Sequence, residues 1–313
     1  MNNNLKTMRD VFIETLYERM KKNKSIYFVS ADLGAPALDK LRQDFKNRFL
    51  NVGIAEQNLI NVSAGLALEG FIVYSYGIAP FITMRGYEPI RQILSITSQI
   101  RPLNVNLIGI GTGLSYNMSG PSHHCLEDLS IMKLLPNFIV FSPSDWKLVE
   151  KFVDFSILNK MPKYLRFDSK PLPNIYDQIT DAVLKRGFYE LKKGKKTCLV
   201  STGFMTHRAL SIAEKINGLG LIDIFILKPI DEKLLFQHLK KYKYIITLEE
   251  GFINNGGLDS LILRIINENK SNIHLKSLGF KDKHIFNLGE REHLHKINKL
   301  GEADIIKIIK SCR

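Results

Sequence analysis

Apolar and polar residues form alternating helical and extended patterns over the first 168 residues. Apolar positions at helical spacing predict helices at residues 5–22, 55–68, 80–96, 125–135 and 145–158. Short runs rich in β-branched and aromatic residues predict strands at 25–32, 49–53, 71–75, 103–111, 138–143 and 162–167. The helix over 55–68 is apolar nearly all round, so we expect it to be buried. Strands separated by helices favour a parallel sheet that helices cover on both faces.

A second α/β series follows a segment of low periodicity, residues 169–184, which contains two prolines and resembles a linker. Strands are predicted beyond it at 197–203, 222–229, 244–251 and 273–279, and helices at 206–217, 231–242, 257–269 and 302–311. We therefore predict two consecutive α/β domains. The first covers residues 1–168 and has a parallel sheet sandwiched by helices, and the second covers residues 185–313 and is smaller and mainly parallel.

Composition adds the expectation of an ordinary globular protein in the cytoplasm. Hydrophobic residues make up 45% of the chain, and no run approaches the roughly 20 apolar residues of a membrane span. The first ten residues, MNNNLKTMRD, lack the apolar core of a signal peptide. The three cysteines are far apart and form no CxxC pair, so we expect neither a disulfide framework nor a metal site in this chain.

The net charge of +13 raises the question of nucleic-acid binding. The basic residues are spread widely, and the denser runs, such as KRGFYELKKGKK, have no aromatic residues interleaved as a stacking platform. We therefore expect a solvated, lysine-rich surface that binds no nucleic acid. A positive surface also attracts anionic, phosphorylated substrates.

One acidic residue, Glu56, begins the predicted helix over 55–68 and precedes an almost uncharged run. The helix dipole favours an acid in the first turn, which is one explanation. Small residues such as Ala55, Ser63 and Ala64 also leave room for another backbone to approach, as at a subunit interface. A carboxyl desolvated there can exist in its protonated form and donate a hydrogen bond to a heterocycle nitrogen. No basic residue is close in the sequence, so we expect no ion-pair partner for Glu56 within this chain.

Two other segments carry candidate chemistry. In SGPSHHCLEDLS, residues 119–130, a Gly-Pro turn precedes His123 and His124 just before a predicted helix. That position suits acid/base chemistry or substrate binding, although two ordinary loop histidines are an alternative. In YGIAPFITMRGYEPIRQ, residues 76–92, Phe81, Met84 and Tyr87 recur at helical spacing, which core packing would explain equally well.

In this order and spacing, the three features resemble the transketolase family of thiamine diphosphate enzymes. The anchors in the first half are ADLG, NVGIAEQN, PFITMRGYEPIR, SGPSHHCLEDLS, FSPSDW and YLRFDS, and those in the second half are LVSTG, LKPID and TLEEGFINNGG. The resemblance covers nearly the whole chain. It implies that the first domain is a pyrimidine-binding domain and the second a transketolase C-terminal domain.

The resemblance implies a cofactor site on the first domain. Glu56 matches the glutamate that hydrogen-bonds a pyrimidine nitrogen of thiamine diphosphate and so activates the thiazolium carbon as a carbanion nucleophile. Phe81 matches the aromatic residue stacked on the pyrimidine ring, and Ile78 and Met84 match positions that line the same pocket. His123 matches the histidine that contacts substrate near the reacting carbons.

The resemblance also implies a substrate site, with departures from the family pattern. Arg166 matches an arginine that binds the sugar phosphate, and Arg9 lies where a second phosphate-binding arginine would be. His124 is a further substrate-binding candidate, and Ser119 stands where the family has an acidic substrate contact. A substrate histidine of ordinary transketolases would fall near Gly111, where none is present. We therefore expect the acceptor end of the substrate site to be remodelled.

The family holds Mg²⁺ and the cofactor's diphosphate through a Gly-Asp-Gly motif and a downstream Asn on an N-terminal domain. This sequence has no Gly-Asp-Gly. The resemblance therefore implies a split transketolase, in which a separate N-terminal subunit holds the diphosphate and Mg²⁺ and two copies of each subunit form a dimer of heterodimers.

We therefore expect a subunit of a two-component enzyme that transfers a two-carbon ketol unit between sugars, with phosphorylated or otherwise activated sugars among the candidates. Two related alternatives stay open: the beta subunit of a 2-oxoacid dehydrogenase decarboxylase component, and part of an enzyme like deoxyxylulose-phosphate synthase. A non-catalytic scaffold or a basic nucleic-acid binder is the alternative from another class.

Overall fold

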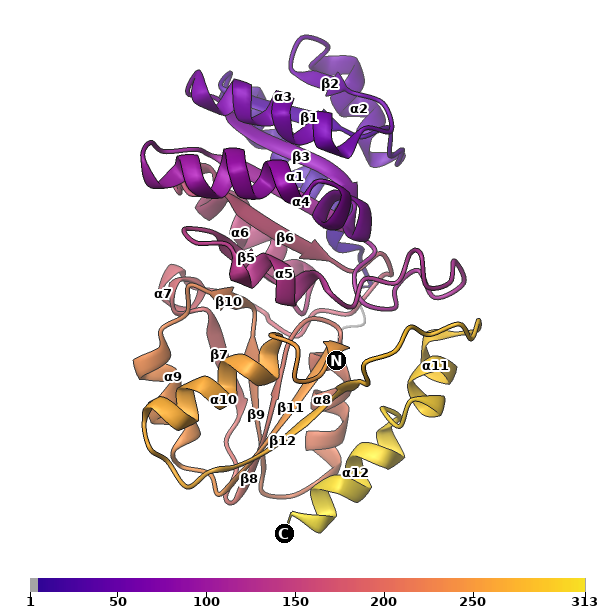
Figure 1. Ribbon diagram of the computed structural model, residues 1–313, viewed down its shortest axis with the longest axis vertical. Helices are drawn as coiled ribbons and strands as arrows, with labels where there is room; N and C mark the ends of the chain where they lie inside the picture. Colours follow the sequence, from indigo (N-terminus) through magenta and orange to yellow (C-terminus); the bar gives the residue numbers. More distant parts are fainter. Residues whose placement is uncertain (1–4, 313) are drawn as a thin grey trace.

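The structure is a computed structural model that describes residues 5–312. Residues 1–4 of the first predicted domain and residue 313 of the second lie outside the described residues. Two α/β layers of different size are stacked along the long axis, with the first half of the chain above the second (Figure 1). This arrangement confirms the predicted fold class of two mainly parallel α/β units.

The first unit is a seven-stranded sheet in the order β10-β5-β6-β4-β3-β1-β2, in which every strand except β10 is parallel. Its strands are β1 (Ile26–Ser30), β2 (Phe49–Asn51), β3 (Ile72–Ile78), β4 (Val105–Ile110), β5 (Ile139–Phe141), β6 (Lys163–Phe167) and β10 (Ile226–Lys228). Its α-helices are α1 (Met8–Lys22), α2 (Ala37–Asp44), α3 (Glu56–Leu68), α4 (Tyr87–Pro89), α5 (Asp128–Leu134) and α6 (Trp146–Leu158).

Apolar side chains cover both faces of this sheet, as its near-continuous apolar strands predict. One face packs against α1 and α6, through residues such as Phe12 and Phe152. The other face packs against α3, α5 and the helical segment after β3, through residues such as Ile60, Ile90 and Met132. Helices therefore cover both faces of the sheet, and in parallel sheets of this kind ligands bind at the carboxyl edge of the strands.

The second unit is a five-stranded sheet in the order β12-β11-β8-β9-β7, parallel except for β7. Its strands are β7 (Phe188–Lys192), β8 (Thr197–Ser201), β9 (Leu219–Ile224), β11 (Tyr244–Phe252) and β12 (His274–Phe280). Its helices are α7 (Asp181–Arg186), α8 (Met205–Lys215), α9 (Glu232–Leu239), α10 (Leu258–Glu268), α11 (Arg291–Ile297) and α12 (Glu302–Ser311).

Several elements differ from the sequence prediction. The predicted strand over 222–229 is two strands, because the chain turns at the buried Phe225 and β10 leaves the second sheet to pair with β5 of the first. Three short elements, α2, β7 and α11, are not among the predicted ones, and α7 takes the end of the predicted linker. The helix predicted over 125–135 begins only at Asp128, because Cys125 forms a β-bridge with Gly113.

Helix α3 is buried on one side only. Leu59, Ile60 and Ala64 lie in the core, whereas Asn61 and Gly65 are exposed, and a Cβ at Gly65 would meet no atom within 4 Å. The expectation of a helix buried all round is therefore wrong for this chain by itself. The exposed side is narrow and lined by small or amide residues. Among residues 5–312, no helix is both long enough and apolar enough to cross a bilayer.

Candidate active site

The residues singled out from the sequence follow successive strands of the first sheet at its carboxyl edge. Glu56 comes after β2, Phe81 after β3, and the loop that carries His123 comes after β4. In parallel sheets this edge gathers the polar loops, and ligands bind there. The fold thereby brings together three segments that are far apart in the sequence.

Glu56 is the first residue of α3, and its side chain is 4% exposed. The preceding residue, Ala55, offers no side chain to cap the helix, so the carboxylate itself lies at the positive end of the helix dipole. The Arg85 guanidinium donates a hydrogen bond of 2.6 Å to Glu56 Oε2. The expectation that Glu56 has no basic partner in this chain is therefore wrong. The partner is distant in sequence and near in space.

Arg85 reaches Glu56 from the helical segment that follows β3. That segment begins as a π-helix over Phe81–Arg85 and continues through α4 into a second π-helix over Ile90–Ile96. A Cβ at Gly86 would lie 2.7 Å from the carbonyl oxygen of Ile82 and 3.7 Å from that of Glu56. Glycine at position 86 therefore avoids a clash within this turn, and it also leaves room for the Ile60 side chain of α3, which would lie 3.3 Å from a Cβ. π-Helical turns of this kind are frequent at functional sites.

Phe81 joins this ion pair to the histidine loop. The Arg85 guanidinium lies over the Phe81 ring at 4.8 Å from the ring centroid. Phe81 also meets His123 in a T-shaped contact with ring centroids 5.2 Å apart. Ser122 Oγ lies 3.0 Å from His123 Nδ1. Glu56, Arg85, Phe81 and His123 therefore form one continuous row of contacts, and three of the four were predicted site residues.

The other predicted pocket residues flank this row. Ile78 is the last residue of β3 and is half-buried, and Met84 is 40% exposed on the π-helix next to Arg85. Ile54, two residues before Glu56, is 77% exposed. The two segments that carry Glu56 and Arg85 thus each present an exposed apolar side chain.

His123 lies on a loop, residues 113–125, that is closed at its base. The backbone N–H of Gly113 donates to the Cys125 carbonyl and the N–H of Cys125 donates back to Gly113, both at 3.0 Å. Ser119 is exposed at the tip of the loop next to the exposed Met118. The loop therefore carries the candidates Ser119 and His123 above a base that the Gly113–Cys125 bridge closes.

The Tyr116 ring fills the space beside Gly111, the position near which we looked for a substrate histidine. Gly111 has φ +89°, and a Cβ built there would lie 2.0 Å from the Tyr116 ring. The ring also makes a T-shaped contact with His123, with centroids 6.4 Å apart, and burial raises the pKa of its phenol. Sequence reasoning missed Tyr116. The available signal was the glycine at 111, five residues before an aromatic residue in the same loop.

Arg9 lies on the Tyr116 side of the site. Its Nε donates to Asp10 Oδ1 at 2.7 Å, and its side chain is 26% exposed. The hydrogen bond to Asp10 raises the pKa of Arg9, and the Tyr76 and Tyr116 phenols add to this effect. Arg9 therefore keeps a partly exposed, charged side chain near Tyr116.

Two predicted substrate contacts are at odds with the structure. The Arg166 guanidinium is buried, with Nε donating to Asp128 Oδ2 at 2.7 Å and a second nitrogen to the Glu250 carbonyl at 3.1 Å. His124 is 4% exposed beneath the loop, and burial lowers its pKa. Arg166 is held by an internal ion pair, and the ring of His124 is enclosed by protein, so neither side chain is presented to a phosphate.

The second domain anchors the base of the histidine loop. Glu250, at the end of β11, accepts the backbone N–H of Leu114 at 3.2 Å. Arg291 of α11 donates to Glu250 and, at 2.6 Å, to Asp168 after β6, while His295 Nε2 lies 2.6 Å from Glu250 Oε1. Burial alone would raise the pKa of Glu250, but Arg291 and His295 hold it well below its usual value. The position of the loop thus depends on both domains.

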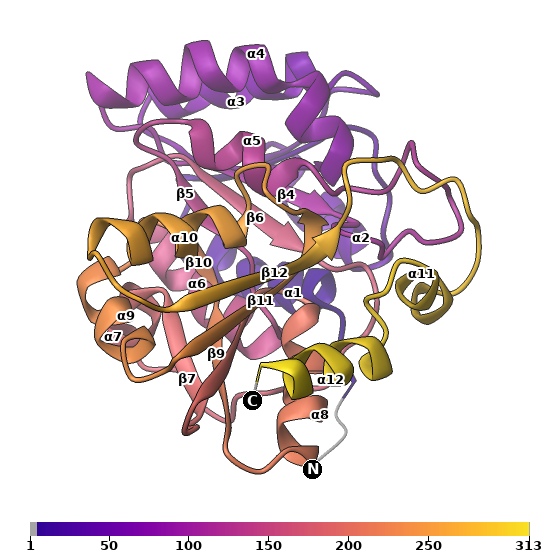
Figure 2. The same ribbon diagram turned by 60° about the horizontal axis from the view of Figure 1, so that its bottom comes forward.

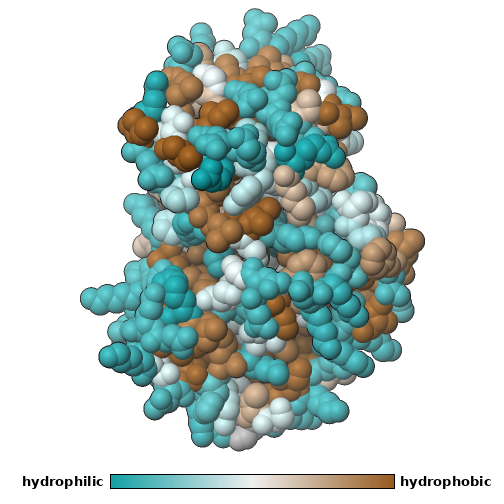
Figure 3. Space-filling model, in the orientation of Figure 1, coloured by the Kyte–Doolittle hydropathy of each residue, from teal (hydrophilic) through white to brown (hydrophobic). Residues whose placement is uncertain are grey.

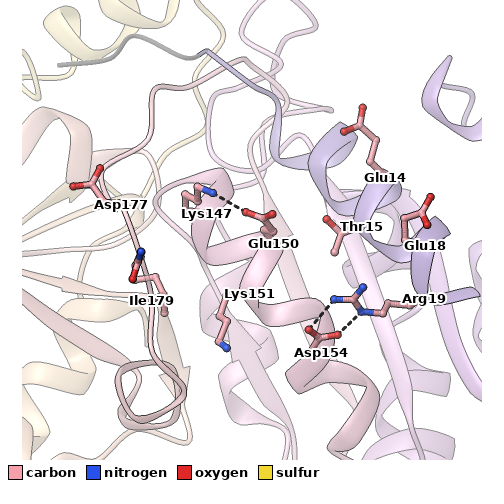
Figure 4. Close-up of a pocket in the computed structure, with 11 residues that line it drawn as sticks. Glu14, Thr15, Glu18, Arg19, Lys147, Glu150, Lys151, Asp154, Asp177 and Ile179 are labelled. Carbon is pink, nitrogen blue, oxygen red and sulfur yellow. Dashed lines mark hydrogen bonds and ion pairs between the residues drawn. The ribbon is translucent and has the colours of Figure 1, made fainter. Parts of the chain in front are cut away.

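A surface hollow of about 650 Å³ lies away from this row, between α1, α6 and residues 177–179 (Figure 4). Four of its charged side chains form two ion pairs, Arg19 with Asp154 and Lys147 with Glu150. None of the predicted site residues lines it. Within residues 5–312, no group of three or more His, Cys, Asp or Glu side chains could hold a metal ion.

Comparisons with known proteins identify the family of the chain. The pyrimidine-binding domain of transketolases matches residues 5–173, and the transketolase C-terminal domain matches residues 188–305. The chain therefore belongs to the transketolase family, whose members are thiamine diphosphate-dependent transferases.

Within that family the chain is similar to proteins named as transketolase subunits. It is 30% identical to an apulose-4-phosphate transketolase subunit of Actinobacillus succinogenes, over 97% of this chain and 98% of that protein. It is 27% identical to a 6-deoxy-6-sulfo-D-fructose transketolase subunit of Clostridium sp. strain MSTE9, over 88% and 85% of the two chains. A solved structure described as a split gene transketolase, in an inactive beta4 tetramer, superimposes with a TM-score of 0.85 at 28% identity and covers 98% of each chain.

Proposed function

We propose that this chain is the pyrimidine-side subunit of a two-component transketolase that transfers a two-carbon ketol unit between sugars. The observation that carries the proposal is the row formed by Glu56, Phe81 and His123 at the carboxyl edge of the first sheet. A buried carboxylate beside an aromatic ring fits a flat heterocycle that has a nitrogen at its edge.

Thiamine diphosphate, when bound, supplies a nucleophilic carbon and an electron sink for breaking a carbon–carbon bond. Glu56 would hold or move the proton on the pyrimidine nitrogen, and Phe81 would bind the face of the ring. Ile78 and Met84 would exclude water from its edges. His123 would bind and orient the sugar hydroxyls near the reacting carbons.

We propose a sugar with an anionic end group as the substrate. The two split relatives are named for sugars that carry a phosphate and a sulfo group. Arg9 offers an accessible guanidinium beside Tyr116, at the end of the site where the family histidine is missing. Ser119, exposed at the tip of the loop, is a further contact. The charge of +13 favours the approach of such a substrate.

We also propose a partner subunit that holds Mg²⁺ and the cofactor's diphosphate, in a dimer of heterodimers. The exposed side of α3 and the exposed Ile54 and Met84 provide a surface for it next to Glu56. A second apolar area lies where the loops 113–125 and 281–290 meet, with Met118, Phe286 and Leu288 exposed. The loops lie side by side in Figures 1 and 2, and brown atoms gather on that side of Figure 3.

The test uses the chain copurified with a subunit that carries Gly-Asp-Gly followed by Asn. We expect Glu56→Gln to lower kcat by about 10²-fold or more while the complex still assembles, because the amide cannot exchange the proton. The exposed Glu88 of α4 provides the matched control, and Glu88→Gln should keep wild-type activity. Full activity of the Glu56→Gln complex would refute the proton role, and tight cofactor binding by the isolated chain would refute the divided site.

The same preparation separates the alternative functions. A 2-oxoacid decarboxylase component would reduce an artificial electron acceptor with a 2-oxoacid, and a deoxyxylulose-phosphate-synthase-like enzyme would consume pyruvate. We expect neither activity, and ketol transfer from a ketose with an anionic end group instead.

A further inference from the structure

The Arg85 guanidinium contacts both the Glu56 carboxylate and the Phe81 ring, the two groups that we propose bind the cofactor's pyrimidine ring. It donates to Glu56 Oε2 at 2.6 Å and lies over the Phe81 ring at 4.8 Å. The acid is almost fully buried, with 4% of its side chain exposed, whereas Arg85 is 50% exposed. One half of the ion pair is therefore fixed in the fold, and the other half reaches in from the surface.

Arg85 has the chemistry of the ring that the site would bind. A guanidinium is flat, delocalised and cationic, donates N–H hydrogen bonds, and stacks on aromatic faces. A protonated aminopyrimidine is also flat, carries an N–H at its edge and stacks through its face. Both groups would use the Glu56 carboxylate as acceptor and Phe81 as platform, so they compete for the same place.

The backbone makes a displacement of Arg85 inexpensive. Arg85 is the last residue of the π-helix, and the next residue is Gly86, so the side chain leaves the helix at a turn. Within the site, Arg85 donates a hydrogen bond to Glu56 and lies over the Phe81 ring. Half of the Arg85 side chain is exposed to solvent. An ion pair with one exposed partner contributes little to stability, because water solvates the released guanidinium.

We propose that Arg85 is a built-in competitor of the cofactor's pyrimidine ring: it closes the Glu56–Phe81 site in the unliganded chain and leaves when the ring binds. The inference rests on the proposed function. Arg85 also holds the Glu56 carboxylate in one orientation while the site is closed, which makes it a positioning residue in the absence of cofactor.

The experiment measures thiamine diphosphate binding to the copurified complex by titration calorimetry in the presence of Mg²⁺. We expect Arg85→Ala to tighten the dissociation constant by about fivefold, the size of one partly exposed ion pair. The dissociation constant of Arg85→Lys should lie between those of wild type and Arg85→Ala, because lysine keeps the charge and loses the flat stacking group. The matched control is Arg91→Ala, which removes an exposed arginine from the same helical segment and should bind like wild type.

A second measurement reports the competition directly. Millimolar guanidinium added to the Arg85→Ala complex should refill the space and weaken cofactor binding, while an equal ionic strength of sodium chloride should not. The wild-type complex should respond equally to the two salts, because its own guanidinium already competes.

The outcomes distinguish the inference from the proposed function. If wild type binds thiamine diphosphate and Arg85→Ala binds it equally or more weakly, the competitor role is overturned and the proposed function stands. If only Arg85→Ala binds, the competition is stronger than expected and the inference holds. If neither binds, the proposed function is overturned and the inference with it.

Discussion

Gly86 follows Arg85 at a turn that has no room for a side chain. A Cβ at 86 would lie 2.7 Å from the Ile82 carbonyl oxygen of its own helical segment and 3.3 Å from the Ile60 side chain of α3. Backbone atoms cannot yield as a flexible side chain can. The absence of a side chain at position 86 thus supports the geometry of the proposed cofactor site.

We therefore expect Gly86→Ala to destabilise the chain by about 1–3 kcal/mol, the usual range for overpacking a filled site. It should also weaken cofactor binding by the complex, because the π-helical segment that ends at this turn also carries Phe81, and the Phe81 ring would shift relative to Glu56. Urea unfolding and calorimetry measure the two effects.

Gly65→Ala is the matched control for stability. Residue 65 lies in α3, a Cβ there meets no atom within 4 Å, and alanine is the better helix former by about 0.5–1 kcal/mol. The isolated Gly65→Ala chain should be as stable as wild type or more so. If both alanines have equal effects on unfolding, close packing at Gly86 is not the cause.

Single residues of the site could be predicted to different degrees. Glu56, Phe81 and His123 stand in motifs with local signatures, so their places at one sheet edge could be anticipated. Arg85 could not, because its pairing depends on how a π-helical turn crosses α3, and no pattern over 81–96 predicts that crossing. The burial of Arg166 could not be anticipated either, because its motif does not reveal that Asp128 lies 2.7 Å away.

At the scale of elements, the loop 113–125 carries the departure from the family pattern. A glycine at 111 with positive φ lets the loop fold back, and Tyr116 packs where a side chain at 111 would be. The Tyr116 ring of this loop therefore lies beside Gly111, near which the family resemblance led us to expect a histidine. Its phenol comes within electrostatic reach of Arg9.

We expect Tyr116→Ala to raise KM for the sugar about tenfold or more with a smaller change in kcat, because the ring positions substrate beside His123 and does not transfer a proton. Tyr116→Phe should keep most of the wild-type KM, since it retains the ring contact with His123. Steady-state kinetics of the complex measure both variants. Equal KM values for wild type and Tyr116→Ala would show that the ring only fills space.

Long periodic elements followed from the sequence, whereas short ones and those decided by tertiary contacts did not. Helix α6 has an apolar stripe and an Asp145 cap that accepts from Leu148 N–H, so its start could be read locally. Strand β10 has three residues and belongs to the first sheet only because β5 offers it an edge. The sequence predicted one strand in place of β9 and β10, because the intervening Phe225 is as apolar as its neighbours.

At the scale of the molecule, buried polar groups connect the two domains and the segment between them. Asp223, at the end of β9, accepts hydrogen bonds from Ser144 at 2.5 Å and from Tyr176 at 2.7 Å, and its other oxygen accepts one from Thr206 at 2.8 Å. These donors come from the first domain, the connecting segment and α8. No cation is among these hydrogen-bond donors, so burial raises the pKa of Asp223 to about 6.

This junction predicts a specific pH dependence of stability. Below the unfolded pKa of 3.8, Asp223 is protonated in both states. Between about pH 4 and 6 the unfolded chain releases this proton and the folded chain retains it, so the free energy of unfolding falls as the pH rises. The difference between the folded and unfolded pKa of Asp223 corresponds to about 3 kcal/mol in the free energy of unfolding. Asp223→Asn removes the titration, and the rotatable hydroxyl groups can still hydrogen-bond the amide.

We therefore expect Asp223→Asn to gain stability relative to wild type as the pH rises from about 4 to 6, measured by urea unfolding at a series of pH values. Asp154→Asn is the control with a different pH window, because the hydrogen bond from Arg19 lowers the pKa of Asp154 below 3.8. Its loss should cost more as the pH rises to about 4 and should change little between about pH 4 and 6. A constant difference between Asp223→Asn and wild type across this range would mean that the acid is ionised within the fold. The two domains would then be joined by a buried carboxylate that three hydroxyl groups alone can stabilise.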